Sequence, residues 1–311
     1  MMSGAPSRDG RFAPSPTGAL HLGNLRTALL AWLFARSAGA RFVVRMEDMD
    51  RDRFREGIEE EQLEDLRALG LDWDGPVVRQ TERMELYEIA IDRLDEQDLL
   101  YPCYCTRREV REAVSAPHGP PSSGYPGTCR NLSKRERAGL EAAGRNPSLR
   151  VRAEGLTAAF EDRVIGRFEG GCDDFVVRRN DGSPAYQLTV VVDDADQGVG
   201  EVVRGDDLAD STPRQIVLQR MLGLPEPGYA HVPLVHGPDG ERLAKRHGER
   251  HGGITLAERR AAGENPREVL SWMACSLDLA DGGESVVASE LLPRFDPDRL
   301  PREPVVWNPE L

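Results

Sequence analysis

One histidine of this chain stands where chemistry on a phosphate group can take place. His21 follows a stretch that is broken by Pro14 and Pro16, which exclude a helix there. The apolar residues after it recur at helical spacing. They are Leu22, Leu25, Leu29, Trp32 and Leu33. The pattern predicts a strand, a tight loop and a helix, with His21 where the helix begins.

The start of a helix suits a phosphate, because its N–H groups are unpaired and carry partial positive charge. Gly18 and Gly23 would let the backbone approach a ligand closely. A histidine that donates a hydrogen bond there could stabilise charge on a transferring phosphoryl group. From this segment alone, a structural histidine beside a turn is the favoured interpretation.

A second segment with phosphate chemistry lies far downstream. The basic residues at 242–246, RLAKR, follow a predicted strand and a Gly-Pro-Asp-Gly turn. A mobile loop that carries Lys245 can close over a nucleotide and compensate phosphate charge. A short basic patch is otherwise ordinary solvated surface.

A short apolar strand is predicted at 41–46, and it ends in the acidic residues at 47–50. Polar side chains at the carboxyl end of a parallel strand commonly face a ligand in open α/β sheets. Glu47 is therefore a candidate for a binding site. A strand that simply ends in solvated acids would look the same.

Three cysteines are spaced so that they could hold a metal. Cys103 and Cys105 flank one residue, and Cys129 follows after a loop rich in Pro, Gly and Ser. Thiolates suit zinc, but three of them leave a tetrahedral site one ligand short. Reduced, partly buried thiols are the alternative. Cys172 and Cys275 fit no ligand spacing.

Composition sets outer limits on the function. The chain has 311 residues and a net charge of −13, so any RNA site must be a local basic patch. Because we find no run of about 18 apolar residues and no apolar leader, we expect a cytoplasmic protein without a membrane span. Five cysteines in a chain of this size argue against a disulfide framework.

Periodicity predicts further elements along the chain. Helices are expected at 55–69, 84–95, 255–261 and 266–276, and another at 211–224 with Ser211 as its N-cap. Residues 173–188 read as a hairpin around the turn Asn180-Asp181-Gly182. The valines at 190–192 favour a strand by propensity.

Several of these segments together resemble class I aminoacyl-tRNA synthetases, in particular the glutamate-specific members. HLGN at 21–24 resembles the HIGH signature, and RFAPSPTG at 11–18 resembles the segment that precedes this signature in glutamate-specific members. RLAKR at 242–246 resembles the KMSKS signature. EDMDRDR at 47–53, Trp73-Asp74 and QTER at 80–83 also follow the glutamate-type pattern. Asn24 stands where the family often has His, and Arg242, Ala244 and Arg246 also depart from KMSKS.

The resemblance implies a doubly wound parallel α/β sheet of the Rossmann type, interrupted by a zinc-binding lobe. It divides the chain into a first catalytic half at 1–100, an inserted lobe at 101–188, a second half at 189–250 and a short helical region at 251–311. It also implies a helix, not a strand, across the valines at 190–192.

The implied chemistry is activation of L-glutamate by ATP, bound with Mg²⁺, to glutamyl-adenylate. His21 and Lys245 would stabilise phosphate charge, and Gly23 and Asn24 would also contact ATP. The resemblance assigns glutamate to Arg11, Ala13, Ser15, Glu47, Tyr186 and Arg204. It assigns one structural Zn²⁺ to Cys103, Cys105, Tyr125 and Cys129.

The acceptor follows from length. The sequence ends about 60 residues after Lys245, and it resembles truncated family members that transfer glutamate to queuosine at the wobble position of tRNA(Asp). A splayed anticodon-loop base is a usual target of specific RNA recognition. Two alternatives stay open: a short glutamyl-tRNA synthetase that charges the 3′ end of tRNA(Glu), and a non-catalytic tRNA-binding relative. A monomer is expected.

Overall fold

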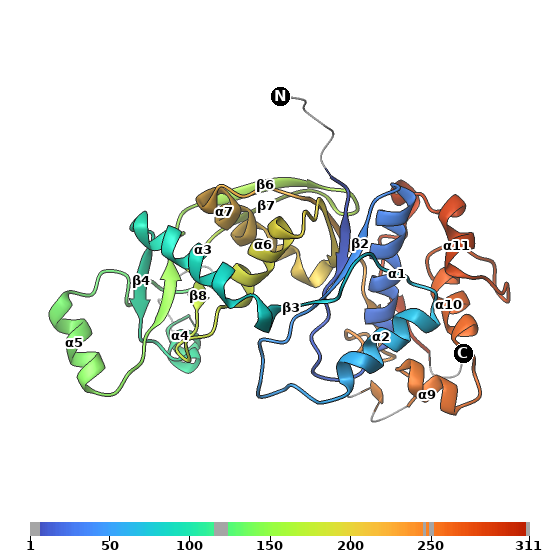
Figure 1. The fold of residues 1–311 in the computed structure, drawn as a ribbon, viewed down its shortest axis with the longest axis horizontal. Coiled ribbons are helices and arrows are strands. Elements are labelled where there is room, and N and C mark those ends of the chain that lie inside the picture. Colours follow the sequence, from blue (N-terminus) through green and yellow to red (C-terminus); the bar gives the residue numbers. More distant parts are fainter. Residues whose placement is uncertain (1–6, 115–123, 245–246, 249–251, 309–311) are drawn as a thin grey trace.

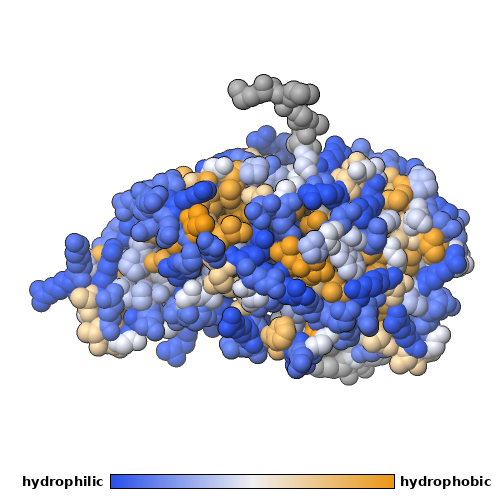
Figure 2. Space-filling model, in the orientation of Figure 1, coloured by the Kyte–Doolittle hydropathy of each residue, from blue (hydrophilic) through white to orange (hydrophobic). Residues whose placement is uncertain are grey.

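The computed structural model describes residues 7–114, 124–244, 247–248 and 252–308. Among these residues, no helix combines the length and the apolar composition that crossing a membrane requires. The face shown in Figure 2 is mostly hydrophilic, and its apolar residues gather in small, separate patches.

A parallel sheet forms the centre of the protein (Figure 1). Its first half has the order β1 (Gly10–Phe12), β2 (Phe42–Met46), β3 (Val78–Arg79), with all strands parallel. On the other side of β1 lies β9 (Glu201–Gly205), and the Gly200 N–H donates to the Asp9 carbonyl at 2.9 Å. The strand order therefore reverses between β1 and β9, which is where open α/β sheets bind ligands.

The second half of the sheet continues outward from β9. β10 (Gly228–Val232) pairs in parallel with β9 and with β6 (Thr157–Asp162), and β7 (Gly166–Gly171) closes the edge antiparallel to β6. A two-stranded parallel ribbon, β11 (Val235–His236) with β12 (Val305–Val306), follows. The strands β6 and β7 thus share a sheet with the second catalytic half, and the four-part division of the chain stays a prediction.

The helix α1 (Leu22–Ser37) carries much of the core. Its apolar residues are buried almost all round, because it packs between the sheet and the C-terminal helices (Figure 1). Arg26 on this helix is buried and donates to the carbonyl of Pro233 at 2.8 Å and to that of Ser276 at 3.2 Å. It thereby ties α1 to the chain after β10 and to the end of α10.

The other helices lie around the sheet. The helices expected at 55–69, 84–95, 211–224, 255–261 and 266–276 are confirmed, with ends shifted by a few residues. They are α2 (Ile58–Ala68), α3 (Met84–Glu96), α7 (Thr212–Leu222), α9 (Leu256–Ala261) and α10 (Pro266–Cys275). The short α11 (Ala288–Leu291) and the 3-10 turns η1 (Gln80–Glu82), η2 (Asp206–Ser211), η3 (Leu292–Arg294) and η4 (Pro297–Arg299) complete the set.

A smaller lobe lies at one end of the molecule (Figure 1). It is an antiparallel sheet of β4 (Leu100–Cys103), β5 (Ser148–Val151) and β8 (Val176–Arg178). The helices α4 (Arg107–Val114) and α5 (Lys134–Ala142) belong to the same region. Ser133 caps α5 by accepting from the Glu136 N–H at 3.3 Å.

Two local expectations are wrong and a third holds only in part. The turn at 180–182 forms, with Gly182 at a φ of 87°, and its arms pair through an antiparallel bridge between Arg178 and Pro184. The second arm does not continue as a strand, and β8 pairs on with β5. Residues after the turn, including the valines at 190–192, form the helix α6 (Tyr186–Asp196), as the family resemblance implied. Ser211 precedes α7 but makes no capping hydrogen bond. Burial of α6 among other helices overrides the strand propensity of valine.

A network of buried charges joins α6 to the first half of the sheet. The side chain of Arg45, on β2, is fully buried, and its Nη1 donates to Asp194 at 2.8 Å while its Nε lies 3.5 Å from Asp193. Asp193 also accepts from Arg83 at 2.7 Å and from the Tyr87 hydroxyl at 2.9 Å. These groups compensate one another, because a lone buried charge is costly.

Replacing Asp193 with alanine should lower the free energy of unfolding by about 3 kcal/mol, because Arg45 and Arg83 then lose a buried partner. This loss of free energy is at the low end of the range for removing one partner of a buried ion pair, because Asp194 still pairs with Arg45. Urea titration measures it. The control is Asp196→Ala on the same helix, whose half-exposed carboxylate should contribute less than about 1 kcal/mol. Equal losses in both variants would contradict this account of the network.

Candidate functional site

A cavity of about 660 Å³ opens at the carboxyl ends of β1, β2 and β9. It gathers nearly all of the nucleotide and amino-acid residues expected from the sequence. Its lining includes Arg11, Ala13, Ser15, His21, Gly23, Asn24, Glu47, Tyr186 and Arg204. Residues that are almost 200 positions apart in the chain therefore meet in one place.

His21 caps the helix α1 through its side chain. Its Nδ1 accepts from the Asn24 N–H at 3.3 Å, and the Asn24 carbonyl oxygen Oδ1 accepts from the His21 N–H at 3.2 Å. Because Nδ1 is an acceptor, a neutral ring carries its proton on Nε2. A Cβ on Gly23 would lie 3.0 Å from this ring, so glycine leaves room for the imidazole. Asn24 thus has a defined role in holding His21.

Glu47 follows β2 and presents a carboxylate to the cavity. Its side chain is 13% exposed and lies 3.5 Å from Arg45 Nη2. Burial raises the pKa of Glu47 in spite of the attraction of Arg45 and Arg11. The group is therefore a carboxylate whose charge is incompletely compensated, as expected for a site that receives a cation.

Arg11 lines the cavity beside it and pairs with the buried Asp194. Arg11 Nε donates to Asp194 at 3.3 Å and its Nη1 donates to the Val203 carbonyl at 3.2 Å, which fixes the guanidinium between β1 and β9. Burial would raise the pKa of Asp194, but Arg11 and Arg45 outweigh it and hold that pKa below its usual range. Asp194 is thus a permanent anion under the cavity.

Arg204, on β9, is buried and not part of a surface ion pair. Its Nε donates to His231 Nε2 at 3.2 Å and its Nη2 donates to Thr212 Oγ1 at 2.8 Å. Its Nη1 is buried and finds no acceptor among the residues that the structure describes. An arginine held by two bonds with one orphaned donor beside a cavity is prepared to bind an anion.

The loop after β11 closes another side of the cavity. Arg242 pairs with Asp207, which lies in η2. His247 is buried: its Nδ1 accepts from the Ala244 N–H at 2.9 Å, and its Nε2 lies 2.9 Å from Asp239. Its ring therefore fixes both sides of this loop. Lys245 and Arg246 lie outside the described residues.

The expected metal ligands form a separate cluster in the lobe. The thiols of Cys103, Cys105 and Cys129 lie within 4.8 Å of one another. The Tyr125 hydroxyl is 3.3 Å from the Cys103 sulfur and 3.7 Å from that of Cys105, while the sulfurs of Cys105 and Cys129 are 3.5 Å apart. In a tetrahedral zinc site with zinc–sulfur bonds of about 2.3 Å, the ligand atoms are separated from one another by about 3.7 Å. The four donors therefore fit zinc.

Electrostatics favours a thiolate in this cluster. A hydrogen bond with Cys105, followed by those from Tyr125 and Arg150, lowers the pKa of Cys103 to about 4. Arg150 Nε donates to the Cys103 sulfur at 3.2 Å, and its guanidinium stacks on the Tyr125 ring at 3.7 Å from the centroid. A positive charge thus stands behind the donor set. Cys172 is buried and Cys275 exposed, both outside the cluster.

A groove of about 1240 Å³ lies between the cluster and the cavity, since Cys103 and Cys105 line the groove and Tyr186 lines both the groove and the cavity. Five arginines line the groove, and no Asp or Glu does among its described lining residues. They are Arg107, Arg111, Arg145, Arg150 and Arg179. On a chain with a net charge of −13, this is the local basic surface that a nucleic acid would need.

Several residues of the site carry no sequence signal. Asp162, Thr212 and His231 hold Arg204, and His247 holds the loop at 237–248. None stands in a motif with diagnostic spacing. Only their burial, which the sequence does not show, distinguishes them from surface residues.

Comparisons with known proteins identify the family. A family model described as the catalytic domain of class I tRNA synthetases (E and Q) matches residues 9–277. The chain is 58% identical to the glutamyl-Q tRNA(Asp) synthetase of Nocardia farcinica, over 95% of this chain and 91% of that protein. It is 54% identical to the glutamyl-Q tRNA(Asp) synthetase of Symbiobacterium thermophilum, over 95% and 94% respectively.

A solved structure agrees. The glutamate tRNA ligase of Elizabethkingia meningosepticum, determined in complex with its amino acid, superposes with a TM-score of 0.83 at 28% identity. The match covers 97% of this chain and 67% of that one. The α/β fold with its parallel sheet, the cavity at the strand ends and the family match agree, and the chain belongs to the class I tRNA synthetases of the E and Q type.

Proposed function

We propose that this protein activates L-glutamate with ATP and transfers the glutamyl group to queuosine at the wobble position of tRNA(Asp). The observation that carries the proposal is the cavity at the strand ends. It brings the phosphate motif at His21 and the amino-acid residues Glu47, Tyr186 and Arg204 together. The names of the two relatives, at 58% and 54% identity, support the choice of acceptor.

The charges of the cavity suit glutamate. A free glutamate carries two carboxylates and one ammonium group. Arg204 offers a buried N–H donor without an acceptor among the described residues, and Arg11 stands nearby. Glu47 offers the matching acceptor for the ammonium group. The hydroxyl of Tyr186, a residue that is 40% exposed at the start of α6, adds a polar group at the rim.

The first step is attack of a glutamate carboxylate oxygen on the α-phosphorus of ATP, which releases pyrophosphate. Positioning and charge stabilisation account for most of the catalysis of such a transfer. His21 Nε2–H, held by the Asn24 cap, is placed to donate to phosphate oxygen near the start of α1. Lys245 would add positive charge from the loop that His247 anchors. ATP would arrive with Mg²⁺.

The second step is attack of a queuosine hydroxyl on the activated carbonyl, which releases AMP. The arginine-lined groove leads to Tyr186 at the mouth of the cavity. Phosphates of an anticodon arm in this groove would deliver a splayed loop base to the adenylate. We also propose that the protein acts as a monomer.

We further propose that Cys103, Cys105, Tyr125 and Cys129 hold one structural zinc ion. The ion would fix the smaller lobe built on β4, β5 and β8, and the wall of the groove that Cys103, Cys105 and Arg150 form. It would take no part in either transfer.

The test of the function is glutamate transfer to three RNAs side by side: queuosine-modified tRNA(Asp), unmodified tRNA(Asp) and tRNA(Glu). We expect radiolabelled glutamate only on the modified tRNA(Asp). Label on tRNA(Glu) would instead show a conventional synthetase. Absence of both label and glutamate-dependent ATP–pyrophosphate exchange would leave only a binding protein.

The raised pKa of Glu47 predicts a pH dependence of glutamate binding. Protonation removes the negative charge that attracts the ammonium group, so the KM for glutamate should rise as the pH falls, beginning above the usual range of a glutamate carboxyl. Glu47→Gln should raise that KM about 10- to 100-fold, the size of one charge-assisted hydrogen bond.

The glutamine variant is its own control for folding. Because burial disfavours the charge of Glu47, the isosteric neutral residue should leave the melting temperature unchanged or raise it. The KM of the variant should no longer rise over the acidic range. An unaltered pH profile in Glu47→Gln would refute the assignment.

Purified protein should contain one zinc ion per chain by elemental analysis, and Cys129→Ser should lose it. The matched control is Cys172→Ser, which removes a buried thiol outside the cluster and should keep the metal. Tyr125→Phe should weaken zinc binding, measured by competition with a chelator. Full retention of zinc in Cys129→Ser would exclude this site.

A further inference from the structure

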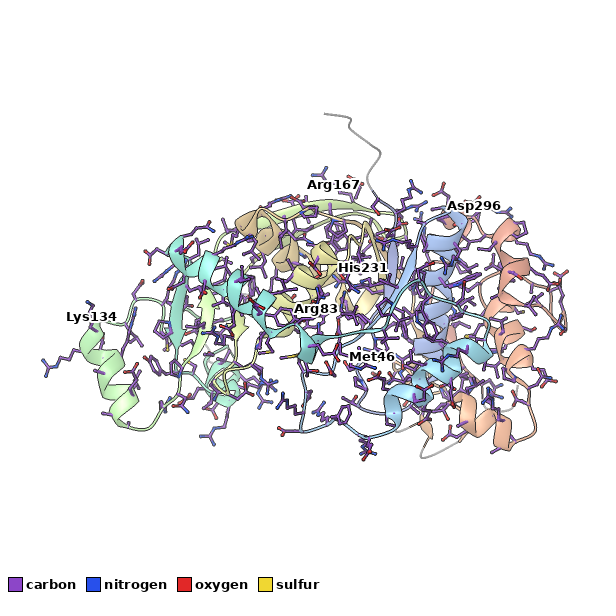
Figure 3. The ribbon with its side chains drawn as sticks, viewed as in Figure 1. Met46, Arg83, Lys134, Arg167, His231 and Asp296 are labelled. Carbon is purple, nitrogen blue, oxygen red and sulfur yellow. The ribbon has the colours of Figure 1, made fainter. Side chains whose placement is uncertain are left out.

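Behind Arg204 lies a chain of buried polar groups that the reaction itself does not use. His231, on β10, is fully buried and lies in the interior of the protein (Figure 3). The imidazole Nδ1 contacts the carboxylate of Asp162, and Nε2 contacts the guanidinium of Arg204. Asp162 is the last residue of β6. The row of polar side chains therefore runs across the sheet from β6 through β10 to Arg204 on β9.

The hydrogen bonds allow only one form of the imidazole. The Asp162 carboxylate lies 2.6 Å from Nδ1 and can only accept, so Nδ1 carries a proton. The guanidinium of Arg204 lies 3.2 Å from Nε2 and can only donate, so Nε2 must offer its lone pair. The ring is therefore neutral with its proton on Nδ1. Burial and the charge of Arg204 agree, since they lower the pKa of His231.

Apolar and backbone contacts hold both groups in place. The Tyr229 ring stacks on the imidazole at 9° with 6.0 Å between centroids. Asp162 Oδ1 accepts from the backbone N–H groups of Val164 at 2.9 Å and Ile165 at 3.0 Å. The carboxylate also accepts from the His231 N–H at 3.1 Å. Asp162 thus cannot rotate without breaking these bonds.

This arrangement fixes the guanidinium of Arg204, a residue that lines the cavity. Its Nε is occupied by His231 and its Nη2 by Thr212, while Nη1 remains without an acceptor among the described residues. We infer that Asp162 and His231 are positioning residues that orient the Arg204 guanidinium for a carboxylate of the amino-acid substrate. The inference rests on the proposed function for the identity of that substrate, whereas the state of the ring does not depend on it.

The isosteric variant Asp162→Asn tests the inference sharply. The backbone N–H groups of Val164 and Ile165 require an oxygen at the inner position, so the amide NH₂ must face His231 Nδ1. Nδ1 then becomes an acceptor and the proton moves to Nε2, where Thr212 Oγ1 at 3.1 Å can accept it but the Nε–H of Arg204 loses its acceptor. Such a substitution beside a histidine can keep the geometry and select the wrong tautomer.

In ATP–pyrophosphate exchange, with tRNA(Asp) present, Asp162→Asn should raise the KM for glutamate about 10- to 100-fold and leave the KM for ATP within about 2-fold. The matched control is Asp174→Asn. Asp174 is equally buried and accepts two backbone N–H groups and one side-chain hydroxyl, from Tyr101, but it lies in the lobe. This control should leave the KM for glutamate unchanged.

A second variant separates positioning from a general loss of structure. In His231→Gln, the amide oxygen keeps an acceptor near the position of Nε2. Unlike histidine, the amide cannot move a proton between two ring nitrogens. In the His231→Gln background, Asp162→Asn should therefore raise the KM for glutamate by less than about 3-fold, whereas independent effects would multiply. The same factor in both backgrounds, or equal rises for glutamate and ATP, would overturn the inference.

Nitrogen NMR reads the ring without any activity. Wild-type His231 should show a protonated Nδ1 and a bare Nε2, and Asp162→Asn should show the reverse, with the signal assigned by its loss in His231→Gln. An unchanged tautomer would overturn the inference. If the wild type lacks glutamate-dependent exchange, the proposed function fails, and the NMR result still decides whether Asp162 sets the ring that holds Arg204.

Discussion

Two adjacent carboxylates on α6 are the constraint on which the site depends. Asp193 and Asp194 compensate two buried arginines and one partly buried arginine from the first half of the chain. Arg11 is on β1, Arg45 on β2 and Arg83 before α3. These residues are more than 100 positions from α6, so the charges can be compensated only when the two halves of the chain are assembled. Formation of the cavity is therefore coupled to formation of the fold.

The same arrangement explains why Glu47 is poorly compensated. Arg45 is shared with Asp193 and Asp194, so little of its charge remains for Glu47 at 3.5 Å. Burial raises the pKa of Glu47, because its neighbours do not fully compensate its charge. Arg204 is incomplete in the opposite sense, with a buried N–H that lacks an acceptor among the described residues. A ligand that carries both an ammonium group and a carboxylate would pair with Glu47 and with Arg204. The protein thus accepts a local loss of folding stability at the groups that bind the ligand.

The sequence predicts the parts of the site that local patterns mark. The Pro- and Gly-broken turn before His21 and the strand before Glu47 place polar groups at strand ends, and parallel strands bring those ends together. His231 and Asp162 carry no such mark. Their partners lie 27 and 69 positions away in sequence, and a buried polar residue without periodic neighbours looks like a surface residue. The valines at 190–192 fail for a related reason, since helix packing overrides their strand propensity.

Strand pairing also changes how the inserted segment should be viewed. The sequence places residue 162 in the lobe, yet β6 pairs with β10, and the Asp162 side chain meets His231 there. The lobe therefore contributes more than a groove wall. If its approach to RNA moved β6 relative to β10, the Asp162 contact would change, and with it the orientation of Arg204. Both the backbone N–H and the ring of His231 bond to this carboxylate, so Asp162 ties the orientation of Arg204 to the pairing of β6 with β10.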